Sequence, residues 1–539
     1  MLNLAATLEY SSNTNPNDPA LYFSGKMITY KEVNIMANKI ANGLINSGIK
    51  RGDRVALCCP NIPQFIFAYF GILKAGCVVL PFNVLLKHNE IEFILDNSQA
   101  SAIICFEGTA ELSIANEVKK AFEKSNSCKK MWVIKSLDNF VLDNNICDFS
   151  LLSNSENNDF DTVQCSSEDT AIILYTSGTT GKPKGAELTH ANILFNAFIC
   201  KDLVKITNSD KVIMSLPLFH VYGQVVMMLS AILSGASLII MPRFDPIEVL
   251  KAMEEYKATV FGGVPTMYWA LLNSVDEANV DINIISSNLR ICSAGGSSLP
   301  IEVLKDFEKR FKVPILEGYG LSETSPGITF NHLGRERKPG SVGQPVWGIE
   351  IKVVDENDEE VKTKDTGEIV VRGHAVMKGY YNNPEGTKDT GEIIVRGHAV
   401  MKGYYNNPEG TKNALKNGWF YTGDIGYYDE DGYLYIVDRV KDMIIRGGYN
   451  VYPRELEEVL IKHPAVSLVA VIGIPHDEWG EEIKACIVLK NGVTCSKEEI
   501  IDFAKSNIAA YKYPRLIDFY DALPLNATGK ILKTELRNL

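Results

Sequence analysis

The sequence contains no pair of cysteines spaced as Cys-x-x-Cys, although it has eleven cysteines among its 539 residues. An odd number of scattered cysteines indicates neither a disulfide framework nor a cysteine-based zinc site. We therefore expect a protein of a reducing compartment.

Positive charge is also scarce, because 54 lysines and arginines stand against 66 aspartates and glutamates, a formal net charge of −12. Binding to nucleic acid draws on a basic face that neutralises phosphates. The balance of charge therefore speaks against a nucleic-acid partner, while small anionic ligands held by a few local cations remain open.

Long uninterrupted hydrophobic runs are missing as well. The most apolar stretch, residues 225–241, is broken by Ser230, Ser234, Gly235 and Ser237 and is too short for a membrane span. We expect a helix followed by a buried strand there. The first 13 residues lack the features of a secretory signal, and the last three are no peroxisomal address. The expectation is a cytoplasmic protein without a transmembrane segment, with peripheral membrane contact left open.

What the sequence does contain, between residues 28 and 106, is an alternation of short apolar runs with segments of helical periodicity. The runs are RVALCC (54–59), CVVLPF (77–82) and SAIICF (101–106). Such alternation is typical of βαβ units with a buried parallel sheet. The same rhythm returns between residues 237 and 293, and a chain of this length favours two or more domains.

The pattern changes after about residue 349, where short alternating strands with turn signals indicate a smaller β-rich section. A compact α+β pattern follows residue 438. We therefore predict an α/β fold with a large N-terminal domain over residues 1–438, made of layered α/β/α sheets plus the β-rich section. A small α+β C-terminal domain is predicted over residues 439–539.

A tandem duplication interrupts the β-rich section. Residues 388–411 repeat residues 364–387 with one difference, Ile394 in place of Val370. Two copies are too few for a solenoid. We expect one copy to supply a strand of the domain and the other to be extruded, and the sequence does not decide which copy does which.

A loop rich in glycine and hydroxyl groups follows the apolar run 171–174. Its sequence, YTSGTTGKPKG (175–185), offers amides, hydroxyls and lysines that suit phosphate oxygens. It is not the P-loop of kinases, because Pro183 stands where that motif requires Ser or Thr. On its own, such a loop is explained equally well as a flexible surface segment.

Four further motifs follow this loop in order: EGYGLSET (317–324), WFYTGD (419–424), DRVKDMIIRGGYNVYPRELE (438–457) and LPLNATGKILK (523–533). The five together resemble the adenylate-forming superfamily, which includes acyl-CoA synthetases, adenylation domains and firefly luciferase. The resemblance covers nearly the whole chain and is closest to bacterial medium- or long-chain fatty acyl-CoA ligases. Removing one copy of the repeat leaves an uninterrupted family pattern.

This resemblance implies that the chain uses ATP, Mg²⁺ and coenzyme A. It implies that Tyr319 stacks on adenine, that Asp424 and Arg439 hold the ribose, and that Glu323 with Thr176 holds Mg²⁺. Ser322, where many relatives have Thr, would touch the α-phosphate. The phosphate-binding loop would comprise Thr176, Ser177, Gly178, Thr179, Thr180, Gly181 and Lys184. Further nucleotide contacts would come from Gly296, Glu317 and Gly318, together with Lys530.

By the same resemblance Lys530 bridges the substrate carboxylate and the α-phosphate, and the catalytic candidates are Lys530, Glu323, Lys184 and His220. The implied acyl pocket comprises His220, Val221, Gly263 and Val264, although His220 taken alone could be a core histidine. Lys441 falls at the family's hinge, about which the C-terminal domain rotates. The implied passage for the pantetheine arm of coenzyme A is formed by Gly447, Gly448 and Tyr449.

Acyl activation also fits what the sequence lacks. A carboxylate, with a pKa of about 4–5, is already ionised at pH 7, so its attack on the α-phosphorus of ATP needs no general base. No G-x-S-x-G elbow occurs in the chain. Two mutually repelling anions do have to be held together by well-placed cations.

The expected function is ATP-dependent activation of a fatty acid to an acyl-adenylate, then transfer to coenzyme A, giving acyl-CoA, AMP and pyrophosphate. An amino-acid substrate is disfavoured because residues 215–224 contain no acidic side chain. The open alternatives are ligation to an acyl carrier protein, another acid–CoA ligase of the same superfamily, a luciferase-type oxygenation and a non-catalytic nucleotide sensor.

Overall fold

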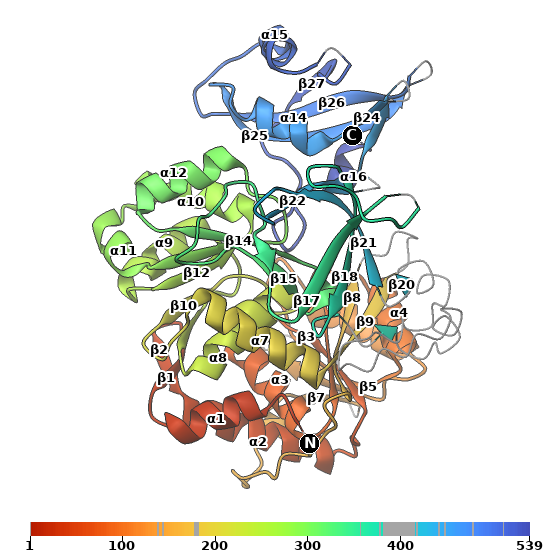
Figure 1. Cartoon of the computed structure of the whole chain (residues 1–539). Coiled ribbons are helices and arrows are strands. Elements are labelled where there is room, and N and C mark those ends of the chain that lie inside the picture. Colours follow the sequence, from red (N-terminus) through yellow and green to blue (C-terminus); the bar gives the residue numbers. More distant parts are fainter. Residues whose placement is uncertain are drawn as a thin grey trace.

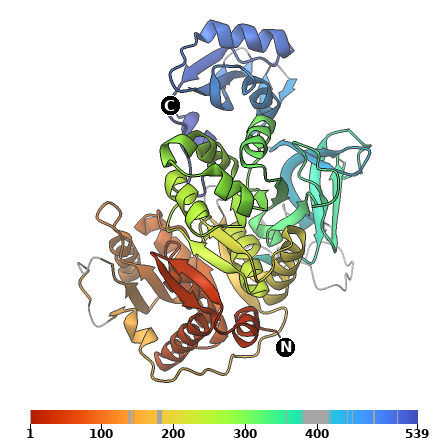
Figure 2. The ribbon, with the colours of Figure 1, turned by 90° about the vertical axis from the view of Figure 1, so that its left-hand side faces the viewer.

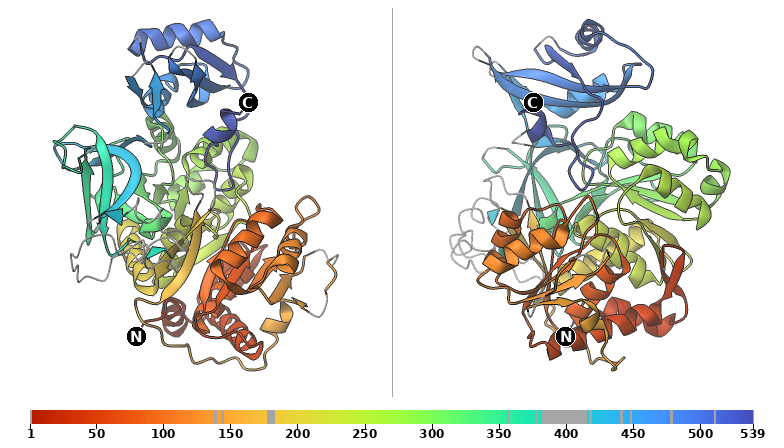
Figure 3. Two further views of the ribbon diagram at one scale, coloured as in Figure 1. Left: turned by 90° about the vertical axis from the view of Figure 1, so that its right-hand side faces the viewer. Right: turned by 180° about the vertical axis from the view of Figure 1, so that it is seen from behind.

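The computed structural model has a mixed α/β fold, as the sequence predicts, with a large N-terminal domain of three sheets and a small C-terminal domain with its own sheet. The C-terminal domain stands on one end of the N-terminal domain in every view (Figure 1, Figure 2 and Figure 3). The structure describes residues 2–136, 140–142, 145–176, 183–355, 357–376, 379–380, 415–416, 419–439, 442–446, 449–476, 479–509 and 511–538.

The first sheet contains the apolar runs of the sequence's first alternating region. Its parallel strands are β8 (Thr170–Thr176), β4 (Val78–Pro81), β3 (Arg54–Cys58), β5 (Ala100–Phe106), β6 (Lys130–Ile134) and β7 (Ile146–Asp148). At the other edge β9 (Lys184–Thr189) runs antiparallel to β8 and pairs with β19 (Gly379–Tyr380). The helices of this region are α2 (Tyr30–Asn46), α3 (Pro63–Lys74), α4 (His88–Ser98), α5 (Ile114–Lys124) and α6 (Ser150–Ser153).

The second sheet carries the next alternating region. Its strands, in spatial order, are β16 (Gln344–Pro345), β15 (Gly327–Phe330), β14 (Ile315–Gly320), β13 (Ile291–Ala294), β12 (Val260–Gly263), β10 (Lys211–Met214), β11 (Ser237–Ile240), β1 (Pro19–Phe23) and β2 (Lys26–Thr29). Its helices are α1 (Ala6–Thr14), α7 (His190–Val204), the π-helix η1 (Tyr222–Leu229), α8 (Ser230–Ser234), α9 (Pro246–Glu255), α10 (Pro265–Ala278), α11 (Ile282–Asn288), α12 (Ile301–Phe311) and the 3₁₀ turn η2 (Ser322–Thr324). The apolar stretch 225–241 is thus helix followed by buried strand, as predicted.

Short sequence signals fix where the helices of this core begin. Thr29 caps α2 and forms a reciprocal capping box with Glu32. Thr189 and Asn192 do the same for α7, so this helix starts directly where β9 ends. The strand pair of β8 and β9 is therefore followed at once by a capped helix.

The third sheet is antiparallel and contains β17 (Ile349–Val354), β18 (Gly367–Gly373), β21 (Trp419–Tyr428), β20 (Leu415–Lys416) and β22 (Leu434–Arg439). Strand β18 belongs to the first copy of the duplicated segment and pairs with both β17 and β21. The second copy, residues 388–411, lies outside the described residues. The first copy therefore supplies the strand, and the predicted extrusion of the second stays a prediction.

The C-terminal domain packs helices against one sheet. Its strands are β24 (Tyr449–Val451), β23 (Ile444–Arg446), β26 (Gly480–Leu489), β25 (Val466–His476) and β27 (Leu516–Phe519), and its helices are α14 (Pro453–Leu460), α15 (Lys497–Asn507) and α16 (Lys533–Leu536). Within the described part of the chain, none of the helices combines the length and apolar character needed to cross a bilayer.

Several polar contacts join the C-terminal domain to the second sheet region. Thr266 Oγ1 donates to the carbonyl oxygen of Gly529 at 2.5 Å, and Trp269 Nε1 donates to Ser467 Oγ at 3.1 Å. Arg454 on α14 donates to the carbonyl oxygen of Gly340 at 3.2 Å. The first of these contacts holds the loop that carries Lys530 against the segment that follows β12.

Candidate active site

Three polar side chains from three strands meet at the edge where the second and third sheets adjoin. Asp424 on β21 is only 3% exposed. It accepts a hydrogen bond from Tyr319 Oη at 2.5 Å, and its other oxygen lies 2.9 Å from Arg439 Nε. Asp424 and Arg439 are direct partners across β21 and β22. This is an anchored carboxylate of the kind that accepts hydrogen bonds from sugar hydroxyls.

The electrostatics of this trio follow from the buried carboxylate. Asp424 raises the pKa of the Arg439 guanidinium, so this side chain stays charged. Burial and then the charge of Asp424 raise the pKa of Tyr319, so its hydroxyl stays protonated and donates. The arrangement holds one negative charge that is neutralised by one fixed cation.

A second group lies where β8 and β9 pair. Thr176 Oγ1 lies 3.2 Å from the Glu323 carboxylate, and Thr176 pairs with Lys184 in the strand register. Both charged side chains are 8% exposed. Burial lowers the pKa of Lys184, and the charge of Glu323 opposes this shift. The loop residues Ser177, Gly178, Thr179, Thr180 and Gly181 lie outside the described residues.

The oxygen atoms of this second group fit a magnesium ion bound together with phosphate. Mg²⁺ prefers oxygen ligands and is usually held by one or two carboxylates plus the phosphates of the substrate. The buried Glu323 carboxylate and the Thr176 hydroxyl provide such oxygens. Lys184 adds a buried cation next to them for a further phosphate charge.

The Lys530 side chain extends from the C-terminal domain to the end of β13 in the second sheet. Its backbone N–H donates to Asn526 Oδ1 at 2.9 Å, and its carbonyl oxygen accepts from the Asn526 N–H at 2.8 Å, which closes a tight turn. Gly296 has φ +82°, and a Cβ added there would lie 3.3 Å from Lys530 Cε. The glycine therefore lets the lysine stem pass close to the end of β13.

The charge on Lys530 is poised near neutral pH. Burial, and then the charge of the nearby Arg439, lower the pKa of Lys530 to about 8, while the charge of Asp424 opposes this shift. Burial and then the charge of Lys530 lower the pKa of His220 to about 3, so this imidazole is neutral at pH 7. Its Nδ1 accepts the Tyr222 N–H at 3.2 Å, which leaves Nε2 as the donor.

The predicted acyl-pocket residues lie beside Lys530. Val264 is buried, and its methyl groups would lie 3.3 Å from a Cβ at Gly296 and 2.9 Å from one at Gly529. Val221 is buried next to His220 in sequence, and Gly263 ends β12. The structure thus brings Lys530, the neutral histidine and an apolar wall together.

Several predicted residues also have contacts outside the two groups described above. Glu317 is buried, accepts the Gly340 N–H at 3.2 Å, and has its pKa raised to about 7 by burial against the opposing charge of Arg454. Tyr449 is 60% exposed and packs against Tyr511, with ring centroids 4.9 Å apart. Gly318 packs under the ring of Phe330, and Ser322, partly exposed, begins η2. Lys441, Gly447 and Gly448 lie outside the described residues.

Two residues that help to form the site are not among those predicted from the sequence. Thr266 holds the carbonyl of Gly529, yet no local signal connects residues 263 positions apart. Asn526 forms the turn that presents Lys530, and it also accepts the N–H of Thr528 at 2.9 Å. The Asn-x-Thr-Gly sequence there is typical of an Asx turn, so this contributor could have been found.

Comparison with known proteins gives the class of this site. Residues 8–381 match the family model "AMP-binding enzyme", and residues 455–530 match "AMP-binding enzyme C-terminal domain". The chain therefore belongs to the AMP-binding, adenylate-forming enzyme family. Within it the chain is an AMP-forming acid–CoA ligase, which uses ATP, Mg²⁺ and coenzyme A.

Individual relatives cover the chain almost end to end. It is 37% identical to a long-chain-fatty-acid–CoA ligase of Bacillus subtilis (strain 168), covering 99% of this chain and 94% of the relative. It is 32% identical to a feruloyl-CoA synthase of an Amycolatopsis species, with coverages of 97% and 96%. The crystal structure of ATP-bound MatB from Rhodopseudomonas palustris matches with a TM-score of 0.85 and 30% identity, with coverages of 100% and 99%.

Proposed function

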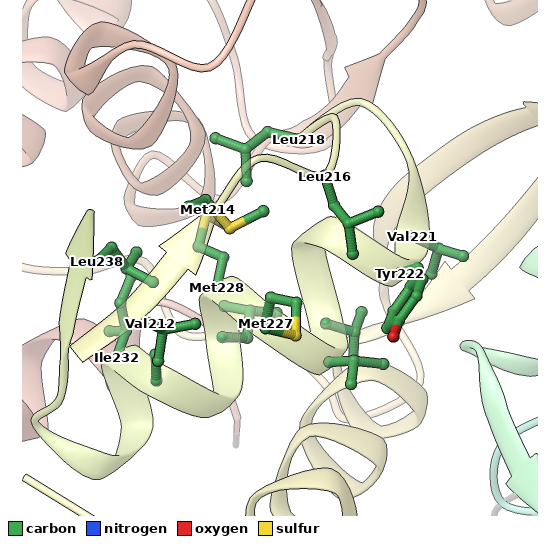
Figure 4. Packing of buried hydrophobic residues seen from close by; sticks show 14 of the residues in the cluster. Val212, Met214, Leu216, Leu218, Val221, Tyr222, Met227, Met228, Ile232 and Leu238 are labelled. Atoms are coloured by element: carbon green, nitrogen blue, oxygen red, sulfur yellow. The ribbon is translucent and has the colours of Figure 1, made fainter. Parts of the chain in front are cut away.

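We propose that the acid is a fatty acid, and that the enzyme converts it in the cytoplasm, through an acyl-adenylate, to acyl-CoA with release of AMP and pyrophosphate. The observation that carries this proposal is the apolar wall that continues from His220. Beyond His220, the π-helix η1 contributes Val225, Met227 and Met228 to the buried hydrophobic cluster. Figure 4 shows Met227 and Met228 among other buried side chains of this cluster. An alkyl chain suits such a wall, and the identity with the Bacillus ligase supports the same substrate class.

For the first step we assign each part of the site a role. Asp424 accepts the ribose hydroxyls, Tyr319 stacks on the base, and Arg439 keeps the carboxylate in place. Glu323 and Thr176 hold Mg²⁺, which supplies positive charge to the phosphates when bound. Ser322 touches the α-phosphate, Lys184 binds phosphate together with the loop at 177–181, and Gly296, Glu317 and Gly318 form the floor of the nucleotide site.

The reacting centre needs cations more than it needs a base. The substrate carboxylate is ionised at pH 7, and His220 is neutral and carries its proton on Nε2. A neutral donor can orient the carboxylate without adding a buried charge. The Lys530 ammonium then bridges this carboxylate and the α-phosphate, so that an oxygen of the acid attacks phosphorus and pyrophosphate leaves.

For the second step we propose that the C-terminal domain turns about Lys441. The described arrangement has Lys530 in the site and Tyr449 exposed on the hairpin of β23 and β24. While Lys530 is there, the pantetheine arm has no path on that side. Rotation would remove Lys530 and bring in Gly447, Gly448 and Tyr449, where two residues without a Cβ leave room for an extended arm.

The test is product analysis with purified enzyme, ATP, Mg²⁺ and coenzyme A. Hexanoic to stearic acid are compared with ferulic, benzoic and malonic acid. We expect acyl-CoA, AMP and pyrophosphate in equal amounts, with the highest kcat/KM for one of the fatty acids. An isotopic label in the carboxyl oxygen should appear in the released AMP.

Two outcomes would contradict the proposal in different ways. A higher kcat/KM for an aromatic or dicarboxylic acid than for every fatty acid would refute the substrate class and leave adenylation intact. Formation of ADP, or AMP without the label, would refute the reaction itself.

A further inference from the structure

Gln224, in the π-helix η1, is an orphaned polar side chain. It is completely buried, and neither its carbonyl oxygen nor its amide nitrogen has a hydrogen-bond partner among the described residues. No other described residue leaves two side-chain polar atoms buried in this way. A buried amide without partners destabilises the fold, so a retained one requires an explanation. π-Helices are rare, occur mostly as short insertions in α-helices, and are frequent at functional sites.

The backbone places Gln224 one helical turn beyond His220. Its N–H donates to the carbonyl oxygen of His220 at 3.1 Å, and residues one turn apart share a face of a helix. Burial and then the charge of Lys530 lower the pKa of the His220 imidazole, so this residue lies near the Lys530 ammonium. Gln224 therefore follows by one helical turn the residue that we assign to the reacting centre, and it lies within η1.

Met227, which follows Gln224 by about one turn, packs against the strand that leads into the acyl pocket. A Cβ added at Gly262 would lie 2.5 Å from Met227 Sδ, so Met227 rests directly on the glycine backbone at the end of β12. Gly262 immediately precedes Gly263 and Val264 of the acyl pocket. The helix that carries Gln224 thus borders the acyl side of the site at Met227, three residues beyond Gln224.

We propose that Gln224 binds a hydroxyl group on the acid substrate, so that the enzyme prefers hydroxylated acids to unsubstituted ones. This inference rests on the proposed acyl-activating function of the same site. A primary amide offers one acceptor and one donor group, and a hydroxyl can pair with both. A ketone or ether would satisfy only the amide nitrogen, and a plain alkyl chain would leave both atoms orphaned.

The position of the hydroxyl follows from the helix. The turn from His220 to Gln224 closes through a hydrogen bond between residues four apart, as in an α-helix, so it advances about 6 Å at about 1.5 Å per residue. An extended chain advances about 1.2 Å per bond, from a span of about 3.5 Å for the three bonds of a residue. The preferred hydroxyl is therefore on about the fifth carbon from the carboxylate.

The first experiment compares kcat/KM for decanoic acid with that for hydroxydecanoic acids bearing the hydroxyl at successive carbons from the third to the ninth. We expect the wild-type enzyme to favour an isomer near the fifth carbon by about tenfold, the effect of satisfying one buried polar group. Gln224→Met, of similar size but apolar, should lose this preference and favour decanoic acid. A wild-type preference for decanoic acid over every isomer, or an unchanged ratio in the variant, would overturn the inference.

The second experiment needs no substrate. Because an apolar side chain removes the unpartnered amide, Gln224→Met should raise the midpoint of thermal unfolding of the free enzyme. A lowered midpoint would mean that the fold itself uses the amide, and would overturn the inference. Gln164→Met, the same change at an exposed glutamine, should alter neither the midpoint nor the substrate ratio.

These results separate the inference from the proposed function. If neither decanoic acid nor its hydroxy isomers yield AMP and pyrophosphate, the fatty-acid proposal is wrong. The comparison is then made between hydroxylated and unsubstituted cinnamic acids, where a ratio unchanged by Gln224→Met contradicts the role of Gln224. If decanoic acid is the best substrate of the series, only the inference fails.

Discussion

Replacing Lys530 by alanine is expected to slow acyl-adenylate formation by about 10²–10³-fold, the usual effect of removing one preorganised group that stabilises developing charge. Lys530 sits against Gly296 and close enough to His220 to lower its pKa, so no other residue of the turn at 526–530 delivers a cation there. Pyrophosphate exchange measures this half-reaction. Thioester formation from supplied acyl-adenylate should keep its wild-type rate, because Lys530 has left the site in the proposed second step.

The control is Lys497→Ala, which removes an exposed lysine of the same domain that pairs with Asp518 at 3.0 Å. It should leave both half-reactions unchanged. An equal loss of both half-reactions in Lys530→Ala would show that the lysine only stabilises the domain and would refute its assigned role.

The pH dependence of the exchange reaction provides a second test of the role of Lys530. Because the pKa of Lys530 is lowered to about 8, the ammonium is lost in the free enzyme as pH rises through this value. The kcat/KM for ATP in the exchange reaction should therefore be constant below pH 8 and fall above it. Lys530→Arg should abolish the fall, because a guanidinium stays charged, even if its maximum rate is lower. Identical profiles in both enzymes would exclude Lys530 as the titrating group.

The parallel core was predictable because its strands are buried on both faces, which leaves continuous apolar runs separated by helical segments. The edges were not. Strand β9 carries Lys184 and Glu187 within a short mixed sequence, and it forms only because β8 offers an edge for antiparallel pairing. Tertiary pairing, and not local propensity, makes such a strand.

The site was predictable to the extent that its motifs carry chemistry in the sequence itself. Tyr319, Asp424 and Arg439 come from separate motifs and meet within hydrogen-bonding distance. Contacts that depend on how two domains meet, such as Thr266 with Gly529, leave no local pattern. The partnerless amide of Gln224 likewise emerges only when burial and hydrogen bonds are known for every neighbour.

Replacing Asp424 by asparagine is expected to raise the KM for ATP by about 100-fold. Each of the two ribose hydroxyls would lose its hydrogen bond to a charged carboxylate, and such a bond contributes about 1.5–3 kcal/mol. The change keeps the size of a side chain that is 3% exposed but removes the charge that holds Arg439 at 2.9 Å. Because the ribose is bound equally in the ground and transition states, kcat should change far less than KM. ATP titration of pyrophosphate exchange gives both constants.

The matched control is Glu350→Gln, which breaks an exposed ion pair with Arg372 in the same sheet. An exposed pair contributes at most about 1 kcal/mol, so this variant should have the wild-type KM for ATP. Thermal unfolding of both variants shows whether either has lost its fold. If folded Asp424→Asn keeps the wild-type KM, or loses kcat with an unchanged KM, the carboxylate does not bind ATP, and the trio of Tyr319, Asp424 and Arg439 serves instead to join the second and third sheets.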